Sequence, residues 1–371
     1  MMRVGIDANP IVGDRGGVGW MTYHLLRALV ALKAQDVEFI AYAKPGSFVG
    51  GKPPDWEHTE NLRWVEAGRW SMPWRGRIDR LDLYHGTNFK LRTEGECGGV
   101  VTIPDLWLDR HPEYSTKVFG QRASFYRTKR TAWRVRKVIT ISQHSAQDIR
   151  SLYGLPADRI VVIPCGVSDE FTPVHDLRAL DDLRQRIGLR TEKFILFVGG
   201  ADPRKNHVTL VKAFAGRMAQ LKDYALVLIG DRVHQFASYI DTVRSCGLEK
   251  YVTCPGRVDI EDLRLLYSAA ALFVFPSIYE GFGMPVLEAM ACGTPVITSN
   301  TTSLPEVAGD AAILINPLDD KELGEAMVRV LSDRKLAEDM RAKGFERIKH
   351  FTWEQTARRV MAVYREVVEQ G

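Results

Sequence analysis

Residues 276–296 decide the fold, and they read Pro-Ser-Ile-Tyr-Glu-Gly-Phe-Gly-Met-Pro-Val-Leu-Glu-Ala-Met-Ala-Cys-Gly-Thr-Pro-Val. The apolar run 272–275 before them has the length of a buried strand, and Pro285 stands where the first turn of a helix tolerates proline. Gly281 and Gly283 let the backbone of the connecting loop approach a ligand closely. A buried strand that runs through such a loop into a helix start predicts an anion site, with phosphate as the expected ligand.

Two carboxylates flank that helix start. Glu280 precedes it in the loop, and Glu288 falls about one helical turn inside the helix, where its side chain can face the same ligand. Taken alone, each glutamate would more often be helix-start charge or a surface carboxylate. Beside a phosphate site, however, the pair suits hydrogen bonds to the hydroxyls of a polyol better than it suits metal ligation.

Strand-like and helix-like segments alternate outward from this segment in both directions. The expected strands of the C-terminal half are 194–198, 224–229, 251–254, 272–275 and 295–299, with helices that end near 221 or cover 260–270 and 285–290. The expected strands of the N-terminal half are 3–7, 37–42, 98–103, 137–142 and 160–163, with a glycine-rich turn at 13–19 and a helix over 20–32. Such alternation is typical of parallel sheets with helices on both faces. The sequence therefore predicts an α/β fold.

A linker is expected in the polar stretch 168–182, which contains Pro173. A length of 371 residues suits two domains that share a cleft. We therefore expect an N-terminal domain over residues 1–170 and a C-terminal domain over 171–350. The last helical segment, 351–371, is expected to pack back across the junction.

The composition limits the class of protein. With 45% hydrophobic and 26% charged residues the chain is globular rather than disordered or fibrous, and a net charge of only +4 argues against a nucleic-acid partner. The five cysteines are scattered, which is typical of reduced thiols. Asp7 precedes any apolar region that could serve as a secretory signal, and no apolar run approaches the roughly 20 residues of a spanning helix. We expect a cytoplasmic protein whose membrane contact, if any, is peripheral.

The positive charge is concentrated in one part of the chain. The excess of Lys and Arg lies in the first 175 residues, as do all tryptophans except Trp353. The run 117–137 is rich in Lys and Arg, and no acidic residue occurs between Glu113 and Asp148. Such a run is usually a solvated helix face. The sharper hypothesis is peripheral contact with anionic lipid at the inner face of the cytoplasmic membrane, with the Trp-bearing stretch 68–77 as a candidate part of the same surface.

The segment from Glu280 to Glu288, within E-G-F-G-M-P-V-L-E-A-M-A-C-G-T-P-V, resembles the signature of the group 1 retaining glycosyltransferases of GT-B fold. The resemblance covers essentially the whole chain, because further segments follow in the family's order: 13–29 as the glycine-rich loop and helix, 140–149 as a strand with a Ser-containing helix start, 197–206 as the phosphate loop and 255–267 as the loop that reads the base. The resemblance implies two Rossmann-like domains facing a cleft. The C-terminal domain would bind a nucleotide sugar and the N-terminal domain a saccharide or lipid-linked acceptor.

The resemblance also implies roles for matched residues. Glu280 would bind hydroxyls of the donor sugar and Glu288 the ribose. Arg204 and Lys205 would neutralise the diphosphate as it leaves, and Asp105 remains as a base or sugar contact on the acceptor side. Further donor contacts are implied for Gly16, Gly17, Val258, Ser277, Gly281, Phe282, Gly283, Met284 and Leu287, and acceptor contacts for His85, Asn88 and Ser142.

Two departures from the family pattern affect the expected chemistry. The family commonly has His-Asp after the strand that ends at 103, whereas this chain has Pro104-Asp105, and a proline side chain cannot carry a proton. Gly200 stands where the family often has a second arginine for the diphosphate, which places more weight on Arg204 and Lys205. The chain contains no Asp-x-Asp, so neither a metal nor a cofactor beyond the nucleotide sugar is expected.

The reaction that the resemblance implies is retaining hexosyl transfer. The segments 85–88 and 105–113 are most similar to mannosyl and related transferases of surface polysaccharide, which favours GDP-mannose as the donor. A UDP-sugar-dependent transferase, a nucleotide-sugar epimerase and a non-catalytic nucleotide-sugar binder with Pro104 stay open as alternatives. A dinucleotide-dependent oxidoreductase is disfavoured, because no acidic residue ends a strand about 20 residues after the glycine loop.

Overall fold

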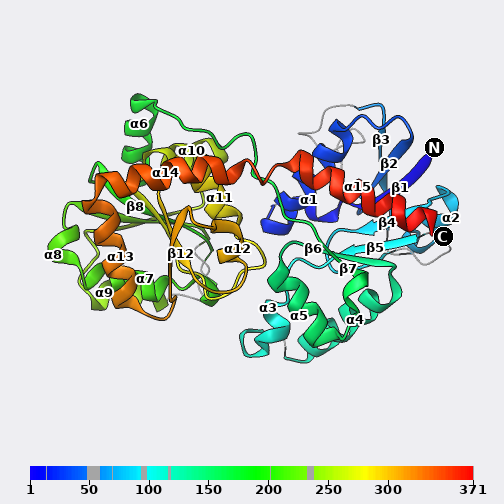
Figure 1. Ribbon diagram of the computed structural model, residues 1–371, viewed down its shortest axis with the longest axis horizontal. Helices are drawn as coiled ribbons and strands as arrows, with labels where there is room; N and C mark the ends of the chain where they lie inside the picture. Colours follow the sequence, from blue (N-terminus) through cyan, green and yellow to red (C-terminus); the bar gives the residue numbers. More distant parts are fainter. Residues whose placement is uncertain are drawn as a thin grey trace. The chain divides into compact units, whose positions relative to one another are not determined.

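The chain forms two compact units, Met1–Gly166 with Thr352–Gly371, and Val167–Phe351. They are seen in a computed structural model that describes residues 1–13, 15–47, 59–68, 70–92, 98–115, 118–200, 202–231 and 238–370. Each unit is built on one parallel sheet, and the chain enters the second unit after Gly166 and leaves it before Thr352 (Figure 1). The sequence had placed these boundaries at 170 and 350.

The first unit contains a seven-stranded parallel sheet of order β3-β2-β1-β4-β5-β6-β7. Its strands are β1 (Met2–Asp7), β2 (Val37–Ala43), β3 (Leu62–Glu66), β4 (Leu83–Gly86), β5 (Gly98–Thr102), β6 (Lys137–Thr140) and β7 (Ile160–Val162). The strand order turns back between β1 and β4, and in open α/β sheets ligands bind outside the carboxyl ends of the strands at such a point.

Alternating side chains of this sheet enter cores on its two faces. Val4, Phe39 and Val100 pack with α1 (Gly17–Ala31) and α15 (Trp353–Glu369), and α15 is the red helix beside α1 in Figure 1. Tyr42 and Val101 point the other way. The other helical segments of this unit are η1 (Asn9–Ile11), η2 (Met72–Trp74), α2 (Arg75–Ile78), α3 (Trp107–Arg110), η3 (Pro112–Tyr114), α4 (Val118–Arg134), α5 (Gln143–Tyr153) and η4 (Ala157–Arg159).

The second unit contains a six-stranded parallel sheet of order β10-β9-β8-β11-β12-β13. Its strands are β8 (Lys193–Val198), β9 (Tyr224–Ile229), β10 (Val252–Gly256), β11 (Leu272–Phe275), β12 (Val296–Ser299) and β13 (Ala312–Ile315). The strand order turns back between β8 and β11, so the loops after these two strands meet at the carboxyl edge of the sheet. Both sheets confirm the predicted α/β class.

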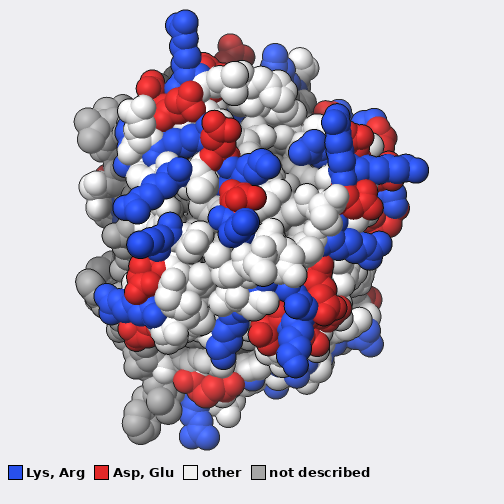
Figure 2. All heavy atoms as spheres, turned by 90° about the vertical axis from the view of Figure 1, so that its left-hand side faces the viewer, with Lys and Arg blue, Asp and Glu red and all other residues white. Residues whose placement is uncertain are grey.

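Helices connect the strands of the second unit. They are α6 (Leu177–Ile187), η5 (Pro203–Lys205), α7 (His207–Ala215), α8 (Met218–Leu221), α9 (Ser238–Ser245), α10 (Ile260–Ala269), α11 (Met284–Ala291), α12 (Leu304–Ala308), α13 (Asp320–Ser332) and α14 (Arg334–Ile348). Around α8 and α9, on the left-hand side of Figure 1, Lys and Arg side chains are interspersed with Asp and Glu (Figure 2). This face carries charges of both signs.

The predicted linker is wrong in its second half. α6 begins at Leu177, inside the stretch 168–182, because Asp176 caps it by accepting hydrogen bonds from the backbone N–H groups of Arg178 and Ala179. Leu180 and Leu183 supply a narrow buried side to an otherwise polar helix. The polar composition therefore concealed an amphipathic helix.

Among the described residues, no helix is long and apolar enough to span a membrane.

Candidate active site

The site of the second unit lies in the loops that follow β8 and β11. Asp202 accepts a hydrogen bond from the backbone N–H of Arg204 at 3.0 Å and so starts the turn η5. The turn ends at Asn206, whose φ of 61° is left-handed. The Ile278 N–H donates to the Arg204 carbonyl at 2.7 Å, which joins the two loops directly.

Asn206 fixes the position of three loops at once. Its buried amide nitrogen donates to the carbonyls of Pro276 at 3.0 Å and Pro317 at 2.5 Å, and its amide oxygen accepts from Thr209 at 2.7 Å. The loops after β8, β11 and β13 are thereby held together. The sequence did not single out this residue; its position directly after Arg204-Lys205 was the available signal.

Glu280 is paired with both predicted cations. The residue is only 6% exposed, with Oε1 at 2.6 Å from the Lys205 Nζ and Oε2 at 3.7 Å from the Arg204 guanidinium. Burial alone would raise the pKa of this carboxyl, but the charges of Lys205 and Arg204 outweigh burial and lower it. The Lys205 Nζ also lies 4.9 Å from the centre of the Phe275 ring. The three residues form one ionised cluster.

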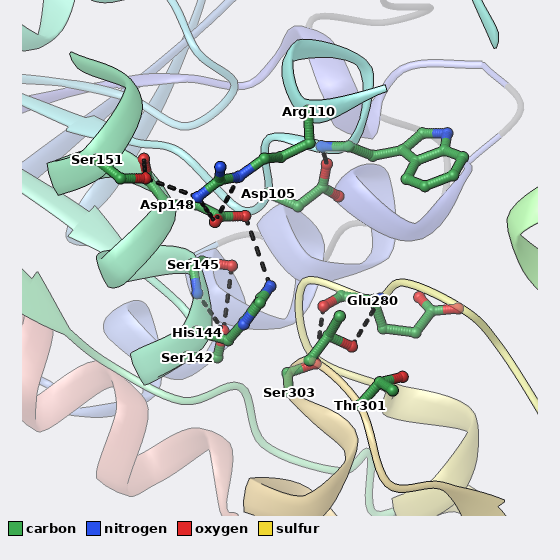
Figure 3. Close-up of polar contacts among 12 residues, drawn as sticks. Asp105, Arg110, Ser142, His144, Ser145, Asp148, Ser151, Glu280, Thr301 and Ser303 are labelled. Atoms are coloured by element: carbon green, nitrogen blue, oxygen red, sulfur yellow. Dashed lines mark hydrogen bonds and ion pairs between the residues drawn. The ribbon is translucent and has the colours of Figure 1, made fainter. Parts of the chain in front are cut away.

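Hydrogen bonds from residues 301–303 hold the backbone around Glu280 in place. The Thr302 hydroxyl accepts from the Glu280 N–H at 3.2 Å, and the Ser303 hydroxyl donates to the Phe282 carbonyl at 2.7 Å. The Ser303 hydroxyl also donates to the Glu280 carbonyl at 2.9 Å (Figure 3). The Thr301 hydroxyl donates to the Ile278 carbonyl at 3.2 Å. These hydroxyl residues, which lie after β12, were not predicted from the sequence.

Gly283 sets the start of α11. Its φ of 116° is left-handed, and a Cβ placed there would lie 2.7 Å from the Leu304 side chain. The first turn follows at Met284 and Pro285, which are half-buried, so α11 begins directly after the Glu280 loop. Unpaired N–H groups and the positive end of the dipole at such a terminus favour an anion.

Glu288 sits one turn inside α11 and is held by a buried tyrosine. The hydroxyl of Tyr267, a fully buried residue of α10, donates to Glu288 Oε2 at 2.9 Å. Burial raises the pKa of Glu288 to about 7, although the Tyr267 hydrogen bond and the charge of Lys205 oppose that rise. Glu288 therefore titrates near neutral pH, unlike Glu280.

The raised pKa of Glu288 predicts that the stability of the protein depends on pH. Between the unfolded pKa of 4.5 and about 7, the folded chain keeps a proton on Glu288 that the unfolded chain loses, so the free energy of unfolding falls as pH rises through that window. Glu288→Gln keeps an acceptor for Tyr267 but cannot ionise. In urea titrations the free energy of unfolding of the variant should exceed that of the parent by about 3 kcal/mol at about pH 8, and the two values should be equal near pH 4. An advantage of equal size at both pH values would contradict the assigned shift.

The other predicted donor contacts differ in accessibility. Val258 is half-buried in the turn between β10 and α10, and Met284 is half-buried at the first position of α11. Gly281 and Phe282 are buried in the loop before α11. Ser277 and Leu287 are fully buried, backbone included, so the structure exposes no atom of these two residues to a donor.

In the first unit, the glycine-rich loop leads into α1. Gly16 is its N-cap and Gly17 its first residue, and both are exposed with open space where a side chain would stand. The helix therefore begins earlier than the predicted residue 20. Asp14 of the same loop lies outside the described residues.

Asp105 follows β5 and is half-buried. Its Oδ1 accepts from the Trp107 N–H at 3.1 Å, which starts the short helix α3. The adjacent Pro104 is buried, and its carbonyl accepts from the Ser145 hydroxyl at 2.8 Å. The backbone in front of Asp105 is thus fixed by α5.

Two predicted acceptor contacts have other roles. His85, for which the resemblance implied an acceptor contact, lies within β4 and is fully buried, with Nδ1 2.6 Å from the Tyr364 hydroxyl and Nε2 2.7 Å from the Thr102 hydroxyl. Ser142 is the N-cap of α5 and accepts from the Ser145 N–H at 3.0 Å. Both are buried structural residues, and we do not assign them to an acceptor. Asn88, just after β4, is half-buried.

The structure adds a charged network beside these residues. Asp148, which is buried in α5, accepts from the Arg110 Nε at 2.8 Å and lies 3.5 Å from the His144 Nε2 (Figure 3). A second buried carboxylate, Asp7 at the end of β1, pairs with Arg92 at 2.8 Å. The i, i+4 spacing of His144 and Asp148 was the only signal for either network. Within the part of the chain that is described, no cluster of His, Cys, Asp and Glu has the size of a metal site.

Comparison with known proteins identifies the family. Residues 181–347 match the family described as Glycosyl transferases group 1, and residues 15–171 match Glycosyltransferase Family 4. The O-antigen chain mannosyltransferase B of Escherichia coli is 35% identical over an alignment of 386 residues, gaps included. The alignment covers 98% of this chain and 100% of that protein. The chain belongs to the group 1 glycosyltransferases.

Two further relatives define the extent of the likeness. This glycosyltransferase is 32% identical over 238 residues to the serotype-specific mannosyltransferase WbdA of Escherichia coli, and the match covers 63% of this chain and 29% of that larger protein. The sucrose-phosphate synthase of Thermosynechococcus elongatus superimposes with a TM-score of 0.79 over 100% of both chains at 24% identity. That structural likeness confirms the expected GT-B fold.

Proposed function

We propose that this glycosyltransferase transfers mannose from GDP-mannose, with retention of anomeric configuration, to a saccharide or lipid-linked saccharide during synthesis of a surface polysaccharide. The observation that carries the proposal is the ionised cluster of Arg204, Lys205 and Glu280 beside the start of α11. The choice of mannose is supported by the name of the relative that spans the whole chain, an O-antigen chain mannosyltransferase.

The cluster supplies both parts of donor recognition. Because the pKa of Glu280 is lowered, its carboxylate is charged at neutral pH and accepts hydrogen bonds from sugar hydroxyls. Lys205 and Arg204 offer positive charge to the diphosphate, together with the N-terminus of α11. These groups stabilise the charge that develops as the diphosphate leaves, and fixed cations in a buried site stabilise such charge more than water does.

No side-chain base is needed in this proposal. The acceptor hydroxyl attacks from the face that the diphosphate leaves, and an oxygen of the departing phosphate takes its proton. This fits the absence of a titratable group at Pro104. Asp105 is the residue we assign to contact with the acceptor, and Glu288 is assigned to the ribose of the nucleotide. No metal is required, because Arg204 and Lys205 provide the positive charge.

We further propose that the acceptor is met at a membrane surface. On α4 the exposed residues include Arg122, Tyr126, Arg127, Arg130 and Trp133, and the segment carries no acidic residue. This outward side is therefore basic and aromatic, as anionic lipid favours. Lys137, which the sequence counted with this run, is in β6 and pairs with Glu366 at 2.8 Å, so it does not belong to the surface.

The experiment that tests the function combines nucleotide binding and turnover. GDP should raise the melting temperature more than UDP, dTDP or ADP, because a ligand that binds only the folded state stabilises it. With GDP-mannose and a mannosylated acceptor, glycoside and GDP should form in the presence of a chelator. Preference for UDP would replace the donor assignment, an epimerised nucleotide sugar would indicate the epimerase, and binding without turnover would indicate a non-catalytic binder.

A further inference from the structure

Residues 70–78 expose large apolar side chains within one short segment. Trp70 is 87% exposed, Trp74 61% and Ile78 61%. Trp70 precedes the turn η2, Trp74 ends it, and Ile78 ends α2. Single exposed hydrophobic residues are common, but two tryptophans and an isoleucine within nine consecutive residues form a patch that indicates an interaction.

The patch is held rigidly by what lies beneath it. Met72, between the tryptophans, is buried in a small core with Tyr42 and Tyr84. The buried Asp79 accepts from the Tyr42 hydroxyl at 2.7 Å and from Arg63 at 2.9 Å. The backbone of the segment is therefore anchored at Met72 and at Asp79, and only the exposed side chains have to be ordered on binding.

The exposed charged residues within 70–80 are positive. Arg77 and Arg80 are exposed, whereas the segment's carboxylate, Asp79, is buried and paired with Arg63 and Arg75. The next acidic residue, Asp82, accepts from the backbone N–H of Arg3 at 2.7 Å. This differs from the face around α8 and α9, where both signs alternate (Figure 2).

The patch and α4 cover the same face of the first sheet. Met72 and Tyr84 form the core under the patch, and Ala132 of α4 belongs to the neighbouring core. Leu91 packs against both cores, and both lie opposite the face covered by α1 and α15. The segment that carries Trp70 and Trp74 therefore covers the same face of the sheet as α4.

We propose that residues 70–80 are a docking element for an anionic lipid bilayer, in which Trp70, Trp74 and Ile78 enter the interface and Arg77 and Arg80 contact lipid headgroups. Tryptophan favours the boundary between headgroups and acyl chains, and each arginine near an anionic surface adds to the binding. A second copy of the chain would bring like charges together, which disfavours self-association. The inference rests on the proposed membrane-bound acceptor.

Vesicle binding tests this element. The full chain should sediment at low salt with vesicles of phosphatidylcholine and phosphatidylglycerol but not with phosphatidylcholine alone. Trp70→Ser/Trp74→Ser should lower the partition coefficient roughly tenfold, and Arg77→Glu/Arg80→Glu should lower it by a similar factor. Leu177→Ser, which alters a 72% exposed leucine of the second unit, is the matched control and should bind as the parent does. Transfer to a soluble acceptor should be unchanged in all variants.

The possible outcomes of the vesicle experiment distinguish the docking element from the proposed function. Parental vesicle binding by both double variants would overturn the docking element. So would concentration-dependent self-association of the parent, seen by light scattering, that the tryptophan variant abolishes. If the tryptophan variant does not fold, the arginine variant decides, since its changes are confined to exposed charges. Vesicle binding by a parent that transfers no sugar would contradict the proposed function while leaving the docking element intact.

Discussion

Lys205→Ala should reduce mannosyl transfer by about a thousandfold, mainly in kcat. Lys205 is the cation closest to Glu280, at 2.6 Å, and Arg204 is more distant at 3.7 Å. Loss of one preorganised group that stabilises transition-state charge costs about a hundred- to a thousandfold. The effect should be at the upper end, because Gly200 leaves no second arginine at the family's other diphosphate position.

The same substitution should also lower stability, which has to be separated from the loss of rate. Removal of Lys205 leaves Glu280 buried with only the more distant partner, at a cost of about 3 kcal/mol. Lys205→Ala/Glu280→Gln removes both charges and should recover most of that stability without recovering transfer. Lys212→Ala, an exposed lysine of α7, is the matched control. Undiminished turnover in both Lys205→Ala and Glu280→Gln would refute the site assignment.

Asn206→Ala should destabilise the second unit by about 3 kcal/mol and impair transfer as well. The substitution leaves the buried carbonyls of Pro276 and Pro317 without their donor, and each such loss costs about 1–3 kcal/mol. It also places alanine at a φ of 61°, which costs roughly 1 kcal/mol more. The free energy of unfolding from urea titration measures the sum.

Two further variants separate the contribution of the left-handed backbone from that of the lost hydrogen bonds. Asn206→Gly relieves the left-handed backbone but not the lost hydrogen bonds, so it should remain destabilised. Thr209→Ala removes only the 2.7 Å bond to the Asn206 amide oxygen and should cost about 1 kcal/mol. If Asn206→Ala loses less than Thr209→Ala, then Asn206 does not hold the three loops together.

The sequence predicted those parts of the site that depend on local pattern. Glu280, Gly283 and the start of α11 follow from a buried strand, two glycines and an early proline. The presence of Lys205 and Glu280 in one site was implied only by the family resemblance, because the two residues are far apart in the chain, and their ion pair was not predicted. Without a homologous pattern, such contacts depend on which strands become neighbours in the sheet.

The residues whose roles were assigned wrongly or missed from the sequence can each be explained. His85 precedes Gly86, which marks a turn, yet β4 continues through both residues because its partners β1 and β5 extend past them. Ser142 was assigned to an acceptor although a serine after a strand and before a helix is most often a cap. Asn206 and Tyr267 were missed because their partners, Pro276, Pro317 and Glu288, lie in other segments of the fold.

The anomeric configuration of the product distinguishes retaining from inverting transfer of mannose from GDP-mannose. GDP-mannose labelled with carbon-13 at C1 should be incubated with the protein and a saccharide acceptor, and the one-bond C1–H1 coupling of the product read by NMR. The proposed mechanism predicts an α-mannoside formed in step with GDP, and no product from Lys205→Ala on the same timescale. A β-mannoside would contradict retention, and the absence of mannosyl transfer to any acceptor would contradict the assigned activity.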